Sequence, residues 1–215
     1  MRPELRRRDF NLQTLSLLAL GLSPAVLHAN AQQTLLVIGD SLSAEYGIPR
    51  GTGWVALLSA QLAKDKPQWQ VINASISGDT TSGGLARLPA LLQQHKPAIV
   101  IIELGGNDAL RGLPLASSRA NLKAMVQAAK SAGAKVLLLG MQVPPNYGAS
   151  YQREFSTMFE QVASQEKAAL VPFLLKGIAD QADAQAWFQP DRIHPLARAH
   201  PLMLNLVWQG LKPLL

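Results

Sequence analysis

Three short polar signatures follow apolar runs in this chain, and together they hold the parts of a hydrolytic site. They are Gly-Asp-Ser-Leu-Ser at 39–43, Gly-Gly-Asn-Asp at 105–108 and Asp-Arg-Ile-His-Pro at 191–195. Ser41 offers a hydroxyl nucleophile and Asn107 an amide donor. Asp191 supplies a carboxylate three residues before the imidazole of His194. Acyl transfer needs these groups: an activated Ser, a His base, a carboxylate that orients the base, and donors for an oxyanion.

Each signature also has a purely structural interpretation. A Ser directly after a strand is commonly a helix N-cap, and a His before Pro often just ends a loop. Asn107 could be a residue that tolerates left-handed dihedral angles, although its flanking glycines already supply that freedom. Gly78, in the polar segment 75–80, could be a plain turn residue or could present its N–H to an oxyanion. Asp40 and Asp108 are expected to be structural and to bond loop backbone.

Apolar runs with the length of buried strands alternate with segments of helical spacing. Strands are predicted at 34–38, 69–74, 98–104, 135–139 and 169–173. Helices are predicted around 54–62, 85–92, 122–129, 155–162 and 196–211. This alternation predicts an α/β fold of three layers, α/β/α, with a five-stranded parallel sheet most simply in flavodoxin-like order.

The predicted sheet also brings the chemistry together. Ligands of open parallel sheets bind beyond the carboxyl ends of the strands, near the point where the strand order reverses. Ser41, Gly78 and Asn107 follow the first, second and third predicted strands. We therefore expect these residues to be neighbours at one edge of the sheet.

The N-terminus has the pattern of an export signal. Its first eight residues include four Arg, residues 12–26 are mostly apolar, and Ala-Asn-Ala at 29–31 has the small-x-small pattern of a cleavage site. The apolar stretch is short for a membrane span and is interrupted by Ser-Pro at 23–24. We expect residues 1–31 to be a signal peptide and residues 32–215 to form one hydrolase domain, periplasmic or secreted.

Composition narrows the classes of partner. Residues 1–31 hold four Arg and two acidic residues, so their removal lowers the net charge from +6 to +4. The remaining basic residues form no run, so nucleic-acid binding has no support. Cysteine is absent, which excludes disulfides, thiolate metal sites and a Cys nucleophile. Residues 7–10 resemble a twin-arginine export motif, and both that route and ordinary Sec export remain open.

Taken together, these motifs resemble the SGNH (GDSL) hydrolase family, whose name states Ser, Gly, Asn and His. The chain is most similar to its bacterial periplasmic branch of acyl-CoA thioesterase I, lysophospholipase and arylesterase enzymes. The likeness extends over about 35–215 and includes the stretches 73–79, 83–92, 103–108 and 144–148.

The resemblance implies the SGNH hydrolase fold and a role for each motif residue. Ser41, Asp191 and His194 would form the catalytic triad. The Ser41 amide, the Gly78 amide and the Asn107 side chain would form the oxyanion hole. The implied partner is a small-molecule acyl ester or thioester, with no metal, no cofactor and no stable membrane anchor. The chain is expected to act as a monomer.

Two positions depart from the family pattern, because Gly usually stands at 45 and 192 where this chain has Glu45 and Arg192. One interpretation is that both side chains point to solvent and change little. The alternative is that Arg192, beside the triad, favours substrates that carry an anionic group.

The acyl-binding groove is harder to predict. Residues on the predicted active edge that could line it, or could simply pack, are Leu42, Leu104, Leu110, Leu113, Pro145 and Tyr147. Residues 109–114, with Gly112 as a pivot, are a candidate mobile lid over the groove.

Three other functions compete with ester hydrolysis of this kind. A metallophosphoesterase needs several His and Asp ligands at a two-metal centre. The chain has four His, of which His28 would leave with the signal and His200 is expected to pack in the final helix. A non-catalytic lipid-binding domain on the same scaffold is a second alternative, since fold does not fix function. Within hydrolases the main alternative is a carbohydrate O-acetylesterase, although the apolar loop residues favour fatty acyl chains.

Overall fold

A five-stranded parallel sheet forms the centre of residues 32–215, the part of the chain that the computed structural model describes. The expected signal peptide at 1–31 lies outside the described residues. The strands are β1 (Gln33–Gly39), β2 (Trp69–Asn73), β3 (Ile99–Glu103), β4 (Lys135–Leu139) and β5 (Ala169–Val171). Their order, β2-β1-β3-β4-β5 with every neighbouring pair parallel, confirms the flavodoxin-like prediction.

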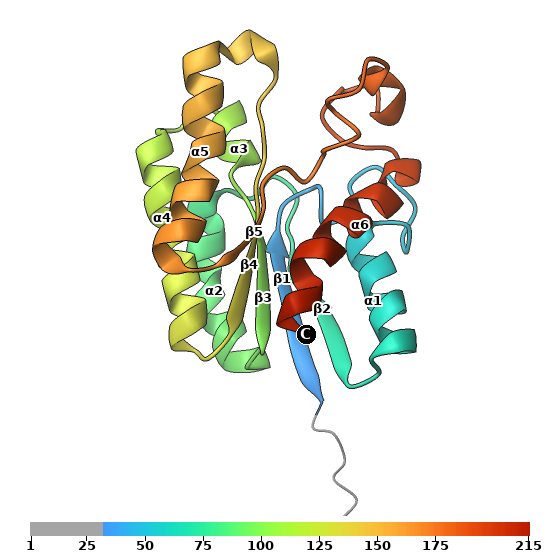
Figure 1. Cartoon of the computed structure of the whole chain (residues 1–215), viewed down its shortest axis with the longest axis vertical. Helices are drawn as coiled ribbons and strands as arrows, with labels where there is room; N and C mark the ends of the chain where they lie inside the picture. Colours follow the sequence, from blue (N-terminus) through green and yellow to red (C-terminus); the bar gives the residue numbers. More distant parts are fainter. Residues whose placement is uncertain (1–31) are drawn as a thin grey trace, which may run out of the picture. The chain divides into compact units, whose positions relative to one another are not determined.

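Helices cover both faces of the sheet, which explains why β1 and β3 are apolar nearly throughout. Figure 1 shows α2 (Thr81–His95), α4 (Leu115–Ser131) and α5 (Ala149–Glu166) on one side of the sheet, and α1 (Trp54–Asp65) and α6 (His200–Leu211) on the other. A short helix, α3 (Gly106–Leu110), follows β3. The 3-10 turns are η1 (Pro145–Tyr147), η2 (Ala184–Trp187), η3 (Ala197–Ala199) and η4 (Lys212–Leu214). No helix among residues 32–215 has the length and apolarity needed to cross a bilayer.

Several element boundaries differ from the predictions, and at two of them proline gives the reason. β5 ends at Val171 instead of 173, because Pro172 has no N–H with which to continue the ladder. The final helix begins at His200, four residues later than predicted, with Pro201 in its first turn, where a missing N–H costs nothing. Residues 197–199 form η3 instead.

Both ends of the described chain lie at the amino edge of the sheet. β1 begins there at Gln33, and the Leu214 carbonyl accepts a hydrogen bond from Lys135 Nζ, at the first residue of β4 (2.7 Å). In Figure 1 this edge is at the bottom, so the carboxyl ends of the strands and the loops that follow them are at the top.

The start of α1 depends on a histidine from the far end of the chain. Gly53 is the N-cap of α1 and offers no side-chain cap, and the Trp54 amide donates instead to His200 Nδ1 (3.0 Å). His200 is 2% exposed, and burial lowers its pKa although the charge of Glu45 acts in the opposite direction. The neutral imidazole is therefore both a packed residue, as predicted, and the acceptor that joins α1 to α6.

We predict that His200→Leu lowers the free energy of unfolding by about 1–3 kcal/mol at alkaline pH, because the buried Trp54 amide loses its acceptor. In the native protein the lowered pKa means that the unfolded chain binds the proton more readily. His200 therefore makes stability fall as the pH drops below about 6.5. Urea denaturation across this range should show a smaller loss on acidification in His200→Leu than in the unmodified chain. Equal acid sensitivity of the two proteins would contradict the capping role.

Candidate active site

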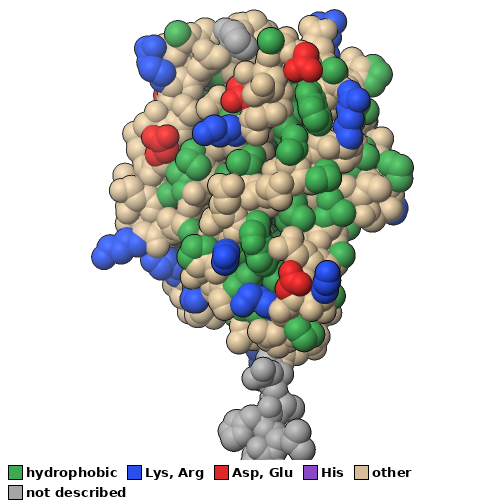
Figure 2. Space-filling model, turned by 45° about the vertical axis from the view of Figure 1, so that its right-hand side comes forward, with side chains coloured by type: hydrophobic (Ala, Val, Ile, Leu, Met, Phe, Trp, Pro, Cys, Tyr) green, Lys and Arg blue, Asp and Glu red, His purple; other side chains and the backbone are tan. Residues whose placement is uncertain are grey.

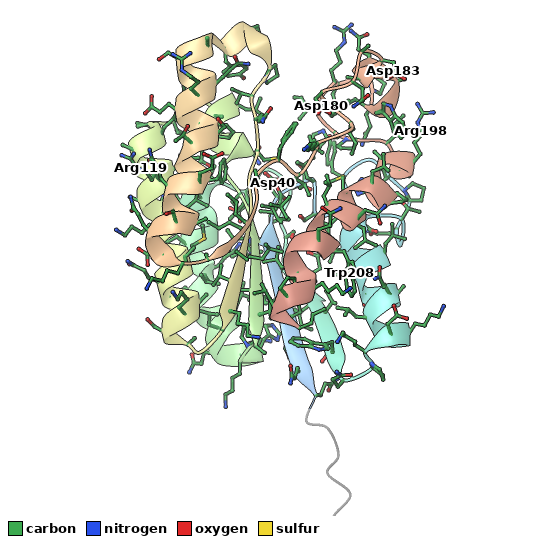
Figure 3. The ribbon with its side chains drawn as sticks, in the orientation of Figure 1. Asp40, Arg119, Asp180, Asp183, Arg198 and Trp208 are labelled. Carbon is green, nitrogen blue, oxygen red and sulfur yellow. The ribbon has the colours of Figure 1, made fainter. Side chains whose placement is uncertain are left out.

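The predicted nucleophile and base meet at the carboxyl edge of the sheet. Ser41 follows β1, and His194 lies in the loop before η3; the two residues are 153 positions apart in the sequence. Ser41 Oγ lies 2.8 Å from His194 Nε2, and His194 Nδ1 lies 2.6 Å from Asp191 Oδ2. In Figure 3 the place is marked by Asp40, the residue before Ser41, above the ends of the strands. The three side chains form one continuous hydrogen-bonded line.

Backbone hydrogen bonds within its own loop orient the Asp191 carboxylate. The amides of Ile193 and His194 donate to Oδ1 at 2.9 and 3.0 Å, which leaves Oδ2 for the imidazole. Burial by itself would raise the pKa of Asp191, but these hydrogen bonds and that with the imidazole outweigh it and hold the pKa at about 2. The carboxylate is thus ionised at neutral pH and accepts a hydrogen bond from the Nδ1–H group of His194. Nε2 is then free to accept the proton of Ser41.

A glutamine side chain joins the nucleophile loop to the histidine loop. Gln189 Nε2 donates to the carbonyls of Tyr46 (2.9 Å) and Pro195 (3.2 Å). The backbone N–H of Gln189 donates to the His194 carbonyl (2.8 Å). The Tyr46 ring lies against the imidazole, with 4.4 Å between ring centroids. These contacts tie the segment that carries His194 to the loop after β1. No feature of the sequence singled out Gln189.

Asn107, in the first turn of α3, points its amide at two of the loops that surround Ser41. Its Nδ2 donates to Asp40 Oδ2 (3.0 Å) and to the Asp79 carbonyl (2.9 Å). Gly78 has a left-handed φ of +79°, which a side chain would strain, and Arg111 Nη2 donates to its carbonyl (2.7 Å). The structure therefore brings Asn107 and the turn that holds Gly78 together, as expected; the use of the Gly78 N–H stays a prediction.

Asp40 and Asp108 are structural, as predicted, although their partners extend beyond loop backbone. Asp40 Oδ1 accepts from the Leu42 amide (3.0 Å), and its other oxygen holds Asn107. Asp108 accepts from the Thr81 amide (2.9 Å) and from the hydroxyls of Thr81 (2.5 Å) and Ser118 (2.9 Å). Both carboxylates thus fix the segments on either side of the site.

The sequence interpretation missed a buried acid that bonds to Asp40 and Ser43, on either side of Ser41 in the chain. Glu103, the last residue of β3, is 0% exposed, and its Oε2 accepts from Ser43 Oγ (2.8 Å) and the Asp40 amide (3.2 Å). Among residues 32–215, Oε1 has no hydrogen-bond partner. The packing is so close that a Cβ on Gly39 would lie 2.8 Å from Ser43 Oγ. The sequence signal that could have revealed this role is that Glu103 is the one charged residue in the apolar run 98–104.

Burial raises the pKa of both carboxyl groups, Glu103 and Asp40. Burial and the neighbouring Asp40 raise the pKa of Glu103 well above its usual range. Burial also raises the pKa of Asp40, to about 6, although hydrogen bonds from the Leu42 amide and its other partners counteract part of this. The negative charge therefore resides preferentially on Asp40, where two N–H donors stabilise it, and Glu103 holds a proton more strongly.

The interpretation that both departures from the family pattern point to solvent is wrong for Glu45. Its side chain is 9% exposed, and Oε1 accepts from the amides of Gly51 (2.9 Å) and Gly53 (2.8 Å). Glu45 thus organises the loop that leads into α1. Arg192 is exposed, and both residues have a left-handed φ, 59° and 60°, which explains why glycine suits these positions.

A cavity of about 490 Å³ opens beside Ser41 and His194 and is lined mainly by apolar side chains. Of the six predicted groove residues, Leu42 and Leu110 line it. Leu104 is 0% exposed in the core, Leu113 and Tyr147 are not among the lining residues, and the Pro145 side chain is outside the described part of the chain. Lining residues that the sequence did not single out include Met141, Val143, Phe155, Phe173 and Phe188.

The candidate lid at 109–114 combines the end of α3 with a tight turn. Gly112 has a φ of +64°, and the Leu113 amide returns to the Asp108 carbonyl (2.9 Å). Leu110 and Leu113 are 46% and 38% exposed. Movement of this segment stays a prediction.

Comparison with known families and proteins gives consistent results. The profile of the GDSL-like lipase/acylhydrolase family matches residues 37–202. The chain is 56% identical to esterase TesA of Pseudomonas aeruginosa over 185 residues, which is 86% of this chain and 90% of that protein. It is 41% identical over 186 residues to thioesterase 1/protease 1/lysophospholipase L1 of Escherichia coli K12, covering 86% of each.

Solved structures agree with the sequence relatives. A crystal structure of TesA, 56% identical, matches 85% of this chain and 100% of its own with a TM-score of 0.82. The psychrotrophic esterase EstA from a Pseudoalteromonas species, in a structure inhibited by monoethylphosphonate, is 40% identical and matches 84% of this chain and 97% of its own with a TM-score of 0.77.

We predict that Glu103→Gln flattens the pH dependence of stability. Because the folded pKa of Glu103 is raised, the folded protein keeps a proton that the unfolded chain loses above about pH 4.3. Stability therefore falls as the pH rises, with a contribution from this group of up to about 1.4 kcal/mol per pH unit. Urea unfolding between about pH 5 and pH 8 should show a shallower fall in Glu103→Gln, whereas exposed Glu160→Gln should match the unmodified chain. An unchanged slope in Glu103→Gln would show that Glu103 is ionised when folded.

Proposed function

Since the chain belongs to the GDSL-like lipase/acylhydrolase family, we propose that it hydrolyses carboxylic esters and thioesters through an acyl-enzyme on Ser41. The observation that carries the proposal is the line of hydrogen bonds from Asp191 through His194 to Ser41, at 2.6 and 2.8 Å, beside an apolar cavity. The relatives named esterase, arylesterase and thioesterase/lysophospholipase suggest aryl esters, acyl-CoA and lysophospholipids as substrates.

In the proposed mechanism His194 acts first as a base and then as an acid. Nε2 takes the Ser41 proton while Oγ attacks the acyl carbonyl, and Asp191 stabilises the imidazolium that forms. His194 then gives the proton to the departing alcohol or thiol as the bond to it breaks. A water molecule, deprotonated by His194, attacks the acyl-enzyme, and the Ser41 oxygen recovers its proton as the carboxylic acid leaves.

The oxyanion would be held by the amides of Ser41 and Gly78 and by Asn107 Nδ2. Both N–H groups of the Asn107 amide already have acceptors, Asp40 and Asp79. We assign the Asn107 N–H that bonds to Asp40 to the oxyanion, because Asp40 adjoins Ser41 in the chain. The bond to the Asp79 carbonyl then keeps the amide in place while its other N–H is shared. Because the amide is already oriented by Asp79, it needs little reorganisation as the charge develops.

The acyl chain is assigned to the apolar cavity. Leu42, Phe155 and Phe173 among its lining residues favour a fatty chain over a sugar ring, which argues against a carbohydrate O-acetylesterase. A non-catalytic lipid-binding domain would have no use for the hydrogen bond between Ser41 and His194. Covalent labelling of Ser41 by a fluorophosphonate tests that alternative.

We also propose that residues 1–31 are an export signal and that the mature enzyme begins at Gln32. The basic, apolar and small-x-small segments in that order support it. N-terminal sequencing of the protein recovered from the periplasm should find Gln32 as the first residue. Recovery of an intact N-terminus at Met1 would contradict the proposal.

We predict that Asn107→Ala lowers kcat by about 10²–10³, the usual effect of losing one oxyanion donor. Ser41→Ala should lower it by about 10⁶, because the triad acts as a unit. Turnover of p-nitrophenyl esters measures both, and the same preparation assayed on acyl-CoA and lysophospholipids identifies the preferred substrate. Normal turnover by Asn107→Ala would remove this residue from the oxyanion hole.

A second prediction concerns Arg192→Gly. Relief of the left-handed backbone, partly offset by the greater freedom of unfolded glycine, should raise stability by up to about 1 kcal/mol. If Arg192 attracts anionic substrates, kcat/KM should fall for a phosphate-bearing ester and stay unchanged for a neutral ester of equal chain length. Equal losses on both esters would show that the guanidinium does not select for charge.

A further inference from the structure

The hydrogen bonds of the triad hold the His194 imidazole at its edges. Nδ1 bonds to Asp191 (2.6 Å) and Nε2 to Ser41 (2.8 Å), so both contacts are made by the ring nitrogens. Hydrogen bonds tolerate a range of angles, and these two therefore resist a tilt of the ring about the line that joins them only weakly. A contact on the face of the imidazole would fix its plane.

The ring of Tyr46 makes such a contact. Its centroid lies 4.4 Å from that of the imidazole, with 40° between the two planes, a separation typical of offset aromatic rings that meet through their faces. Tyr46 is 50% exposed, and Figure 2 shows hydrophobic side chains, a class that includes Tyr, at the surface in the upper part of the molecule. The contact with His194, and not the exposure, is what requires a reason.

The backbone on both sides of Tyr46 is held in a left-handed conformation. Glu45 has a φ of 59° and Gly47 a φ of 69°. The Glu45 carboxylate accepts the amides of Gly51 (2.9 Å) and Gly53 (2.8 Å), which keeps this residue in place. A left-handed residue other than glycine persists only where its surroundings impose it, and such residues cluster at functional sites. The turn that presents Tyr46 is therefore imposed by the structure around it.

Hydrogen bonds also join Tyr46 to both loops of the triad. Its N–H donates to the Ser41 carbonyl (3.4 Å), and its carbonyl accepts from Gln189 Nε2 (2.9 Å). The backbone N–H of Gln189 donates in turn to the His194 carbonyl (2.8 Å). The residue that contacts the imidazole is thus tied to the turn of the nucleophile and to the loop of the base.

We propose that Tyr46 is a positioning residue that holds the His194 imidazole while the acyl-enzyme is hydrolysed. This role rests on the proposed function. Once Ser41 is acylated, its oxygen has no proton to donate to Nε2, so the imidazole loses one of its two hydrogen bonds. The other is made by the Asp191 side chain, which is 37% exposed, so that water competes for it. The contact with the Tyr46 ring does not depend on the state of Ser41.

Hydrolysis of the acyl-enzyme needs an accurately placed Nε2. This nitrogen takes a proton from water as the water oxygen bonds to the acyl carbon. It returns the proton to the Ser41 oxygen as the bond between that oxygen and the acyl carbon breaks. During acylation, in contrast, the Ser41 hydroxyl itself aligns Nε2. Loss of the Tyr46 ring should therefore slow deacylation more than acylation.

The test compares Tyr46→Leu, which removes the aromatic ring, with Tyr46→Phe, which keeps it. Acid quenching during saturated turnover of a p-nitrophenyl ester, followed by mass spectrometry, gives the fraction of acylated Ser41. The value of kcat divided by this fraction is the rate constant of deacylation, and kcat/KM reports acylation. In Tyr46→Leu we expect deacylation to slow by about tenfold and kcat/KM to fall by less than about threefold. Tyr46→Phe should match the unmodified chain in both quantities.

The NMR signals of the imidazole protons give a readout that needs no substrate. Loss of the ring current of Tyr46 should shift the His194 signals in Tyr46→Leu and leave them nearly unchanged in Tyr46→Phe. His95, the last residue of α2, is the internal control, and its signals should stay in place in both variants if the fold is intact.

Three results would overturn the proposal. They are an unchanged rate of deacylation in Tyr46→Leu, equal losses in deacylation and kcat/KM, and a loss in Tyr46→Phe as large as in Tyr46→Leu. The second would show a general disturbance of the site, and the third would assign the effect to the hydroxyl group. Failure of the proposed function is distinct from all three, because the unmodified chain would then hydrolyse no ester and form no acyl-enzyme.

Discussion

The hydrogen bond between Ser41 and His194 is the constraint around which the rest of the domain is arranged. It joins the turn after the first strand to a loop near the end of the chain, 153 positions away, so it forms only when the whole sheet is assembled. Further contacts secure the same closure. Gln189 holds the two loops together, and His200 accepts the first amide of α1, so the histidine segment is tied to the N-terminal part of the domain at two more points.

Two carboxyl groups, those of Asp40 and Glu103, are buried close to Ser41 in a core that is otherwise mostly apolar. Glu103, whose pKa burial raises, accepts a hydrogen bond from the Ser43 hydroxyl, and Asp40 accepts one from the Asn107 amide. Burial of an ionisable group with an unpartnered oxygen is costly. The cost is understandable here because both groups fix the turn that presents Ser41, and a turn of this kind must keep one geometry throughout the reaction.

Much of the fold could be predicted from the sequence because its central strands β1, β3 and β4 are buried on both faces and read as nearly continuous apolar runs. The strand order followed from the alternation of strands and helices, and the meeting of Ser41 with Asn107 followed from that order. The cavity could not be predicted in the same way. Phe155 and Phe173 have the pattern of ordinary core residues, and only their placement in three dimensions brings them to the cavity that Ser41 also lines. Gln189 and His200 act through single long-range hydrogen bonds, which leave no periodic trace in the sequence.

The position of the chain ends has a practical consequence. Gln33 and Leu214 both lie at the pole of the domain opposite to Ser41, because parallel strands enter the sheet at one edge and deliver their loops to the other. A linker attached at either end of the described domain would therefore leave the face that carries Ser41 unobstructed. Immobilising the enzyme on a bead or fusing it to a carrier through these ends orients the cavity beside Ser41 outward.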